Sequence, residues 1–102
     1  GNVMKTSEDA ARDARKRERM LSREDEKKRL REEKARMKRL AELEARILES
    51  EEILANLERD MGDPDYFRDA DRAREGAKEH AALTVLIANL YQEWEAVQPD
   101  VA

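Results

Sequence analysis

The fold is decided by residues 40–69, LAELEARILESEEILANLERDMGDPDYFRD. In the first part of this stretch, apolar residues recur at alternating spacings of three and four, which is the pattern of a coiled-coil seam. The pattern stops at Gly62, a residue type common at helix C-termini, and Asp63-Pro64 cannot continue a helix. We therefore predict a helix that ends at Met61. Its predicted seam consists of Leu40, Leu43, Ile47, Leu54, Leu57 and Met61, with Ser50 as its one polar position.

A second apolar series follows this stretch and predicts a second helix. The series starts after Asp69, whose side chain can cap a helix N-terminus, and Pro99 ends it. The predicted seam of this second helix consists of Ala73, Ala77, His80, Leu83, Ile87, Leu90, Trp94 and Val97.

The two predicted helices must pack together, because a helix with a single apolar stripe is not stable alone. The linker between them, residues 62–69, is short enough to fold one helix back on the other. We predict an all-α fold, in which residues 40–98 form an antiparallel two-helix coiled-coil hairpin with its turn at 62–69. The heptads give a register in which Met61 faces Ala73, Leu54 faces His80, Ile47 faces Ile87, Leu40 faces Trp94 and Met37 faces Val97.

Charge divides the chain into a basic and an acidic part. Residues 12–39 carry 14 Lys or Arg against 7 Asp or Glu, whereas residues 40–102 carry 6 against 16. The basic part contains many good helix formers and few apolar residues, so we predict a helical extension without a packing partner. Ser22 with Asp25 is a candidate capping box within it. We expect residues 1–11 to be a disordered tail or a tag remnant, in front of one domain of a larger protein.

Composition excludes several classes of function. Charged residues make up 45% of the 102 residues and aromatic residues 4%, so a thick core with an enclosed catalytic pocket is not expected. The absence of cysteine excludes disulfides and thiolate metal sites, and favours a reducing, cytoplasmic location. No apolar run approaches the length of a membrane span, so we expect no membrane partner. We predict a protein that is not an enzyme and holds no cofactor.

The turn and the single histidine each invite a chemical interpretation that the residues do not support. Aspartates fall at four ligand positions of an imagined calcium loop, but Phe67, Arg68 and Arg74 occupy positions that require a ligand, a glycine and a glutamate. We therefore favour capping and turn formation for the aspartates, and packing in the seam for His80. Tyr66 and Phe67 could form an exposed contact at the tip, but packing of one ring onto the helix ends is the more common outcome. The four aspartates are Asp63, Asp65, Asp69 and Asp71.

Three segments together resemble the C-terminal domain of ABC-F proteins. They are MKRLAELEARILESEEILANLERDM at 37–61, GDPDYF at 62–67 and LYQEWEAV at 90–97, and the resemblance covers about residues 22–98. ABC-F proteins are cytoplasmic tandem ATPases that engage the ribosome, and their C-terminal coiled coil is implicated in contacts with ribosomal RNA or DNA. The resemblance implies the same role here. The chain has no Gly-rich phosphate loop and no signature sequence, so ATP and Mg²⁺ are expected only in ATPase domains of the parent protein.

Cations of the basic part are the candidate contacts to a phosphate backbone. A helix that carries many Lys and Arg gives affinity and salt sensitivity without reading a sequence. The alternative for these residues is a solvated helix face with ion pairs such as Glu24 with Lys28 and Glu32 with Arg36. The alternative function for the chain is a coiled-coil module for protein interaction or dimerisation. We expect a monomer in isolation, because one hairpin satisfies its own seam. The candidate residues are Arg15, Lys16, Arg17, Arg19, Arg23, Lys27, Lys28, Arg29, Arg31, Lys34, Arg36, Lys38 and Arg39.

Overall fold

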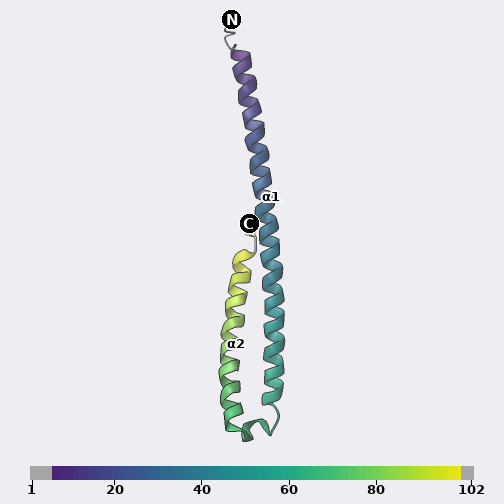
Figure 1. Cartoon of the computed structure of the whole chain (residues 1–102), viewed down its shortest axis with the longest axis vertical. Helices are drawn as coiled ribbons and strands as arrows, with labels where there is room; N and C mark the ends of the chain where they lie inside the picture. The colour runs from purple at the N-terminus through teal and green to yellow at the C-terminus, as the bar shows by residue number, and fades with distance from the viewer. Residues whose placement is uncertain (1–5, 100–102) are drawn as a thin grey trace. The chain divides into compact units, whose positions relative to one another are not determined.

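The computed structural model describes residues 6–99, and all regular secondary structure in this range is helical (Figure 1). Helix α1 spans Ser7–Met61, the short 3₁₀ helix η1 spans Tyr66–Arg68, and helix α2 spans Ala70–Val97. The chain divides into two compact units, Gly1–Ala35 and Arg36–Ala102. The predicted all-α fold is confirmed.

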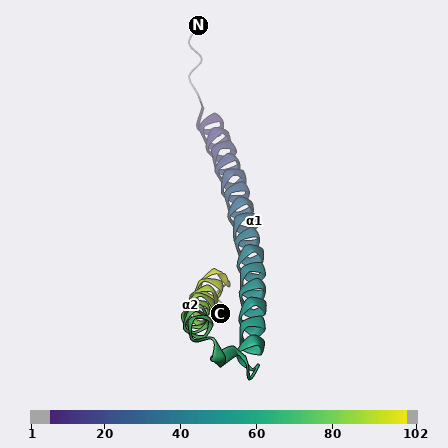
Figure 2. The same cartoon turned by 60° about the horizontal axis from the view of Figure 1, so that its bottom comes forward.

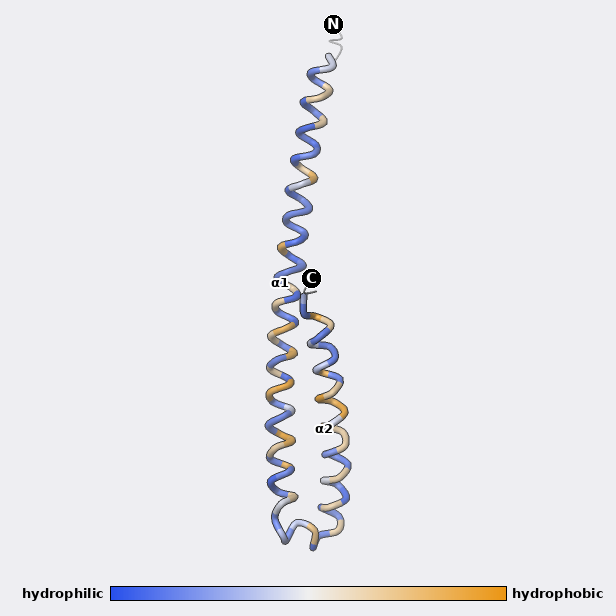
Figure 3. Tube along the Cα trace, turned by 180° about the vertical axis from the view of Figure 1, so that it is seen from behind, coloured by the Kyte–Doolittle hydropathy of each residue, from blue (hydrophilic) through white to orange (hydrophobic). Residues whose placement is uncertain are grey.

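The second unit is a helical hairpin in which α2 runs back alongside the C-terminal part of α1 (Figures 1 and 2). Contacts at its two ends establish the antiparallel direction. Arg36 donates a hydrogen bond from Nη1 to the carbonyl oxygen of Val97 at 3.3 Å. Towards the turn, Nε2 of His80 lies 3.1 Å from Oε1 of Glu58. The predicted hairpin is therefore confirmed, and Figure 3 shows apolar positions recurring along both of its helices.

The core of the hairpin is a narrow seam. Leu43, Leu90 and Ile47 form its buried apolar cluster, with exposed fractions of 0%, 2% and 7%. Trp94 and Val97 pack against this cluster and are half-buried. The side chains that point inward follow the predicted alternation of three and four, because this spacing keeps one stripe of each helix facing its partner. Buried or half-buried seam positions are Leu40, Leu43, Ile47, Ser50, Leu54, Leu57 and Met61 on α1, and Ala73, Gly76, His80, Leu83, Ile87, Leu90, Trp94 and Val97 on α2.

The predicted seam is wrong at one position of α2, where Gly76 is buried and Ala77 is exposed. The reason is the ring of Tyr66, which is 2% exposed and lies against Gly76. A Cβ atom on Gly76 would lie 1.5 Å from Oη of Tyr66 and 2.8 Å from its Cζ. Only glycine leaves room for this ring in the seam.

Two neighbouring aromatic rings at the tip of the hairpin differ in their burial. Tyr66 donates a hydrogen bond from Oη to the carbonyl oxygen of Arg72 at 3.1 Å, and the guanidinium of Arg72 lies 4.9 Å from the centre of the Tyr66 ring. Phe67 meets Tyr66 edge-on, with ring centroids 5.2 Å apart, and is 64% exposed. The expectation that one ring packs onto the helices is met by Tyr66.

Both helix boundaries at the turn match the prediction. The N–H of Gly62 donates to the carbonyl oxygens of Glu58 and Arg59, both at 3.1 Å, which closes α1 without a positive φ angle at the glycine. A side-chain oxygen of Asp63 accepts the N–H of Asp65 at 3.0 Å and shapes the turn. Asp69 caps α2 by accepting the N–H of Arg72 at 3.1 Å, as predicted.

The start of α1 differs from the sequence-based expectation. Residues 7–11 are helical rather than disordered, and Ser22 lies inside the helix, so it does not cap a helix. The cap is instead a reciprocal pair, because Thr6 Oγ1 accepts the N–H of Asp9 at 3.2 Å and Asp9 Oδ2 accepts the N–H of Thr6 at 3.4 Å. Residues 1–5 of the expected tail lie outside the described residues.

Polar contacts flank the seam and fix the register of the hairpin. Nη2 of Arg39 lies 2.6 Å from Oε2 of Glu93, close to the predicted register. The indole N–H of Trp94 donates to Oε1 of Glu44 at 3.1 Å, about one helical turn from Leu40, its predicted partner. Such pairs are exposed, so each one stabilises the hairpin by at most about 1 kcal/mol.

Tyr91 provides a pH-dependent contact across the helices. Its hydroxyl donates to Oε1 of Glu51 at 2.5 Å. This hydrogen bond raises the pKa of Tyr91 above its ordinary value of 10.0, and lost hydration of the phenol and the charge of Glu51 add to the rise. Because the pKa is raised in the folded state, the contact stabilises the hairpin fully below about pH 10, and this contribution is lost as pH rises through the raised pKa.

We therefore predict that Glu51→Gln moves the pKa of Tyr91 back towards 10.0. Glutamine carries no charge, and its amide can accept from the phenol or donate to the phenolate, so both protonation states of Tyr91 can be hydrogen-bonded and the neutral phenol loses its preferential stabilisation. An NMR titration of the tyrosine ring carbons measures this shift, and Glu52→Gln is a control with the same change in charge. An identical titration of Tyr91 in wild type and Glu51→Gln would contradict the assignment.

Candidate nucleic-acid interface

The first unit presents a solvated helix, residues 7–35 of α1. Almost every side chain here is exposed, including the larger apolar residues Met20, Leu21 and Leu30 at 55%, 65% and 61%. Figure 3 shows this part of the chain as mainly hydrophilic. A helix of this composition buries little apolar surface within its own unit, so its side chains are available to a partner.

One face of this helix carries only cations among its charged residues between 16 and 34. At about 100° per residue, its six cations fall within an arc of roughly 120° and extend over about 27 Å of helix. Met20 and Leu30 lie in the same arc, whereas every Asp and Glu of this stretch lies outside it. We call this surface the basic face. It consists of Lys16, Arg19, Arg23, Lys27, Arg31 and Lys34.

Few cations of the basic face are occupied by ion pairs. Nζ of Lys27 lies 3.8 Å from Glu24, with both side chains about two-thirds exposed. The other five members have no ion-pair partner among residues 6–99. Because exposed pairs contribute at most about 1 kcal/mol, the single pair at Lys27 does not prevent a phosphate contact.

The remaining candidate cations of this unit lie beside or opposite the basic face. Lys28 pairs with Glu32 at 3.9 Å, and Arg29 pairs with Glu26. The predicted pair of Glu24 with Lys28 is not present, because Glu24 pairs with Lys27 and Lys28 with Glu32. Arg15 and Arg17 flank the basic face on either side. The pairs of Lys28 and Arg29 therefore lie outside the basic face, mainly on the opposite side of the helix.

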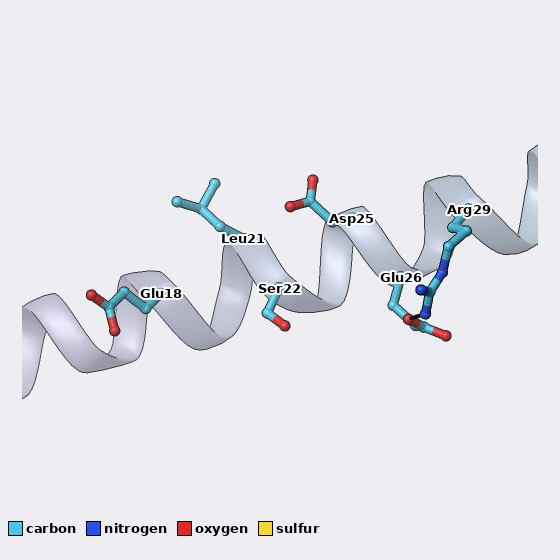
Figure 4. Close-up of a pocket in the computed structure, with 6 residues that line it drawn as sticks. All are labelled: Glu18, Leu21, Ser22, Asp25, Glu26 and Arg29. Carbon is cyan, nitrogen blue, oxygen red and sulfur yellow. Dashed lines mark hydrogen bonds and ion pairs between the residues drawn. The ribbon is translucent and has the colours of Figure 1, made fainter. Parts of the chain in front are cut away.

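A shallow hollow on that opposite side is unsuited to phosphate. Figure 4 shows its six side chains, all of which come from α1. Three of them are carboxylates, and the one cation is already paired with one of these carboxylates. The net negative charge repels a phosphate backbone. The lining residues are Glu18, Leu21, Ser22, Asp25, Glu26 and Arg29.

Candidate cations of the second unit have a different environment. Arg39 contacts Glu42 at 3.7 Å in addition to Glu93, and Arg36 is half-buried beside the end of α2. Lys38 is exposed. The structure thus places Arg36 and Arg39 in contacts that support the hairpin, so substitutions there affect the fold as well as any ligand.

Two absences complete the description of residues 6–99. No helix in this range is long and apolar enough to cross a membrane. No three side chains of the types that ligate metals converge within the same range. The basic face is the surface of residues 7–35 on which positive charge is concentrated.

Comparison with known proteins identifies the family. The family model for the ABC transporter C-terminal domain matches residues 31–98, which include the whole hairpin and the candidate cations Arg31, Lys34, Arg36, Lys38 and Arg39. Neither the curated proteins nor the solved structures yielded a match. The family match covers well over half of the 102 residues. This chain belongs to the ABC transporter C-terminal domain family.

Proposed function

We propose that this chain is the nucleic-acid-binding accessory domain of an ABC-F ATPase that acts on the ribosome. The ligand is the phosphate backbone of ribosomal RNA or DNA. The observation that carries the proposal is the basic face, where six exposed cations are gathered on one side of a helix and acidic side chains are confined to the other sides.

The chemistry of the basic face suits a backbone rather than a base sequence. Lys and Arg neutralise phosphates and release counterions. The two neighbours in the arc, Met20 and Leu30, offer no hydrogen bonds to base edges. Binding is therefore expected to follow the shape and charge of the nucleic acid and to show little sequence preference.

Assignment to the ABC-F group rests on the resemblance of the turn GDPDYF and the closing segment LYQEWEAV. In this interpretation the domain acts in the cytoplasm and has no catalytic role of its own, because ATP and Mg²⁺ belong to the ATPase domains of the parent protein. The turn of the hairpin is shaped by contacts of Asp63, Tyr66 and Asp69.

Co-sedimentation with purified ribosomes tests this proposal. We expect the chain to pellet with ribosomes at low ionic strength and to be released as salt is raised, because phosphate contacts weaken with salt. Excess duplex DNA added to the same mixture establishes whether DNA competes for the surface. A chain that stays in the supernatant with ribosomes at low salt, while remaining helical by circular dichroism, would refute the ribosomal role.

A further inference from the structure

The hairpin carries a second surface, an open groove between α1 and α2 on the acidic part of the chain. It lies within the second unit and is separate in sequence from the basic face. The groove is lined by Glu44, Ile47, Leu48, Glu51, Tyr91 and Trp94.

Apolar side chains in this groove are exposed beyond what packing of the hairpin requires. Leu48 is 71% exposed and Tyr91 is 42% exposed, although both adjoin the core residue Ile47. Trp94 is half-buried, so part of its ring faces the groove. Aromatic side chains beside an exposed leucine are typical of a contact that binds an apolar side chain of a partner.

The polar atoms of the groove carry uncompensated negative charge. Glu44 accepts a hydrogen bond from the Trp94 indole, and Glu51 accepts one from the Tyr91 hydroxyl, so both carboxylates are held in place. Within residues 6–99, no Lys or Arg lies at ion-pair distance from either carboxylate. Each carboxylate retains acceptor capacity for a cation.

We propose that this groove binds a basic amphipathic helix of another protein. The partner places an apolar side chain over Leu48, Tyr91 and Trp94, and places Lys or Arg on Glu44 and Glu51. The two carboxylates are seven residues apart, about 10 Å along α1, which matches cations two turns apart on a helix laid alongside.

Charge complementarity favours a basic amphipathic helix over nucleic acid as the occupant of the groove. Residues 40–102 carry ten more acidic than basic side chains, which repels nucleic acid and attracts a cationic partner. The exposed leucine and the aromatic rings then favour an amphipathic segment over a free cation. The groove and the basic face therefore serve partners of opposite charge, and neither surface depends on the other.

Trp94 is the single tryptophan of the chain, so its fluorescence reports on the groove directly. The test titrates the whole chain with a short designed helix that has Leu on one face and Lys on the other, and with a control helix that has Glu in place of Lys. We expect the Lys helix to change the Trp94 emission in a saturable manner and the Glu helix to leave it unchanged.

A pair of matched variants separates this groove from general attraction to an acidic protein. Glu44→Gln with Glu51→Gln keeps both acceptors for Trp94 and Tyr91 but removes the charges, and should weaken binding of the Lys helix about threefold to tenfold. Glu49→Gln with Glu52→Gln removes the same charge elsewhere on α1 and should change the affinity for the Lys helix little. Equal weakening by both variants, or an unchanged Trp94 emission, would overturn the proposal. Emission that changes with protein concentration alone would overturn it in favour of a second copy as occupant.

Discussion

Gly76→Ala is expected to destabilise the hairpin by about 2 kcal/mol, although the same exchange stabilises an ordinary helix interior by up to about 1 kcal/mol. The added methyl group would lie 1.5 Å from Oη of Tyr66. The ring of Tyr66 is 2% exposed and bonded to the carbonyl of Arg72, so it cannot move aside without losing its burial and its hydrogen bond. Urea denaturation followed by far-UV circular dichroism measures the decrease in the free energy of unfolding.

A second substitution distinguishes this clash from a general intolerance of the position. Tyr66→Ala removes the ring and should by itself cost about 3 kcal/mol. In that background Gly76→Ala should become stabilising, because the clash is gone and alanine favours the helix. If Gly76→Ala remains destabilising without Tyr66, the close contact between the two residues is not the cause.

Neutralising three cations of the basic face is expected to weaken nucleic-acid binding about tenfold or more at low salt. The variant combines Arg19→Gln, Arg23→Gln and Arg31→Gln, and glutamine preserves helix propensity. Each lost phosphate contact also reduces the steepness of the salt dependence by about one unit. Fluorescence anisotropy of labelled structured RNA and duplex DNA measures both quantities.

The matched control removes the same charge from the same helix but outside the basic face. It combines Arg15→Gln, Arg17→Gln and Lys28→Gln. If binding depends on the arrangement of cations, this control should stay within about threefold of wild type, since general attraction changes equally in both variants. Equal losses in the two variants would show that net charge, rather than the basic face, governs binding.

Much of the hairpin could be predicted from sequence because its signals are local and repeated. The heptad spacing gave the seam of α1 and the approximate register, and Asp69 and Pro99 marked the bounds of α2. Gly76 was missed because a search for apolar residues passes over glycine. Strict alternation after Ala73 would have placed it in the seam. Burial of Tyr66 rather than Phe67 depends on that tertiary contact and has no local signal.

The start of α1 and the basic face could both have been predicted from the sequence. Thr6 with Asp9 fits the spacing of a capping box, but its position close to the start of the sequence favoured a disordered tail. The candidate cations could also be sorted by helical angle once a continuous helix was assumed. The predicted register already set Arg36 and Arg39 near the end of α2, but their contacts with Val97 and Glu93 depend on side-chain conformations that the heptad pattern does not specify.

The salt dependence of binding by the wild-type chain tests the central claim most directly. Anisotropy titrations of structured RNA and duplex DNA at a series of salt concentrations give the slope of log affinity against log salt, which counts the phosphates neutralised. We predict micromolar binding at low salt that weakens steeply as salt is raised, with a slope between about three and six from the six cations of the basic face. No binding at low salt, or binding that is insensitive to salt, would contradict it.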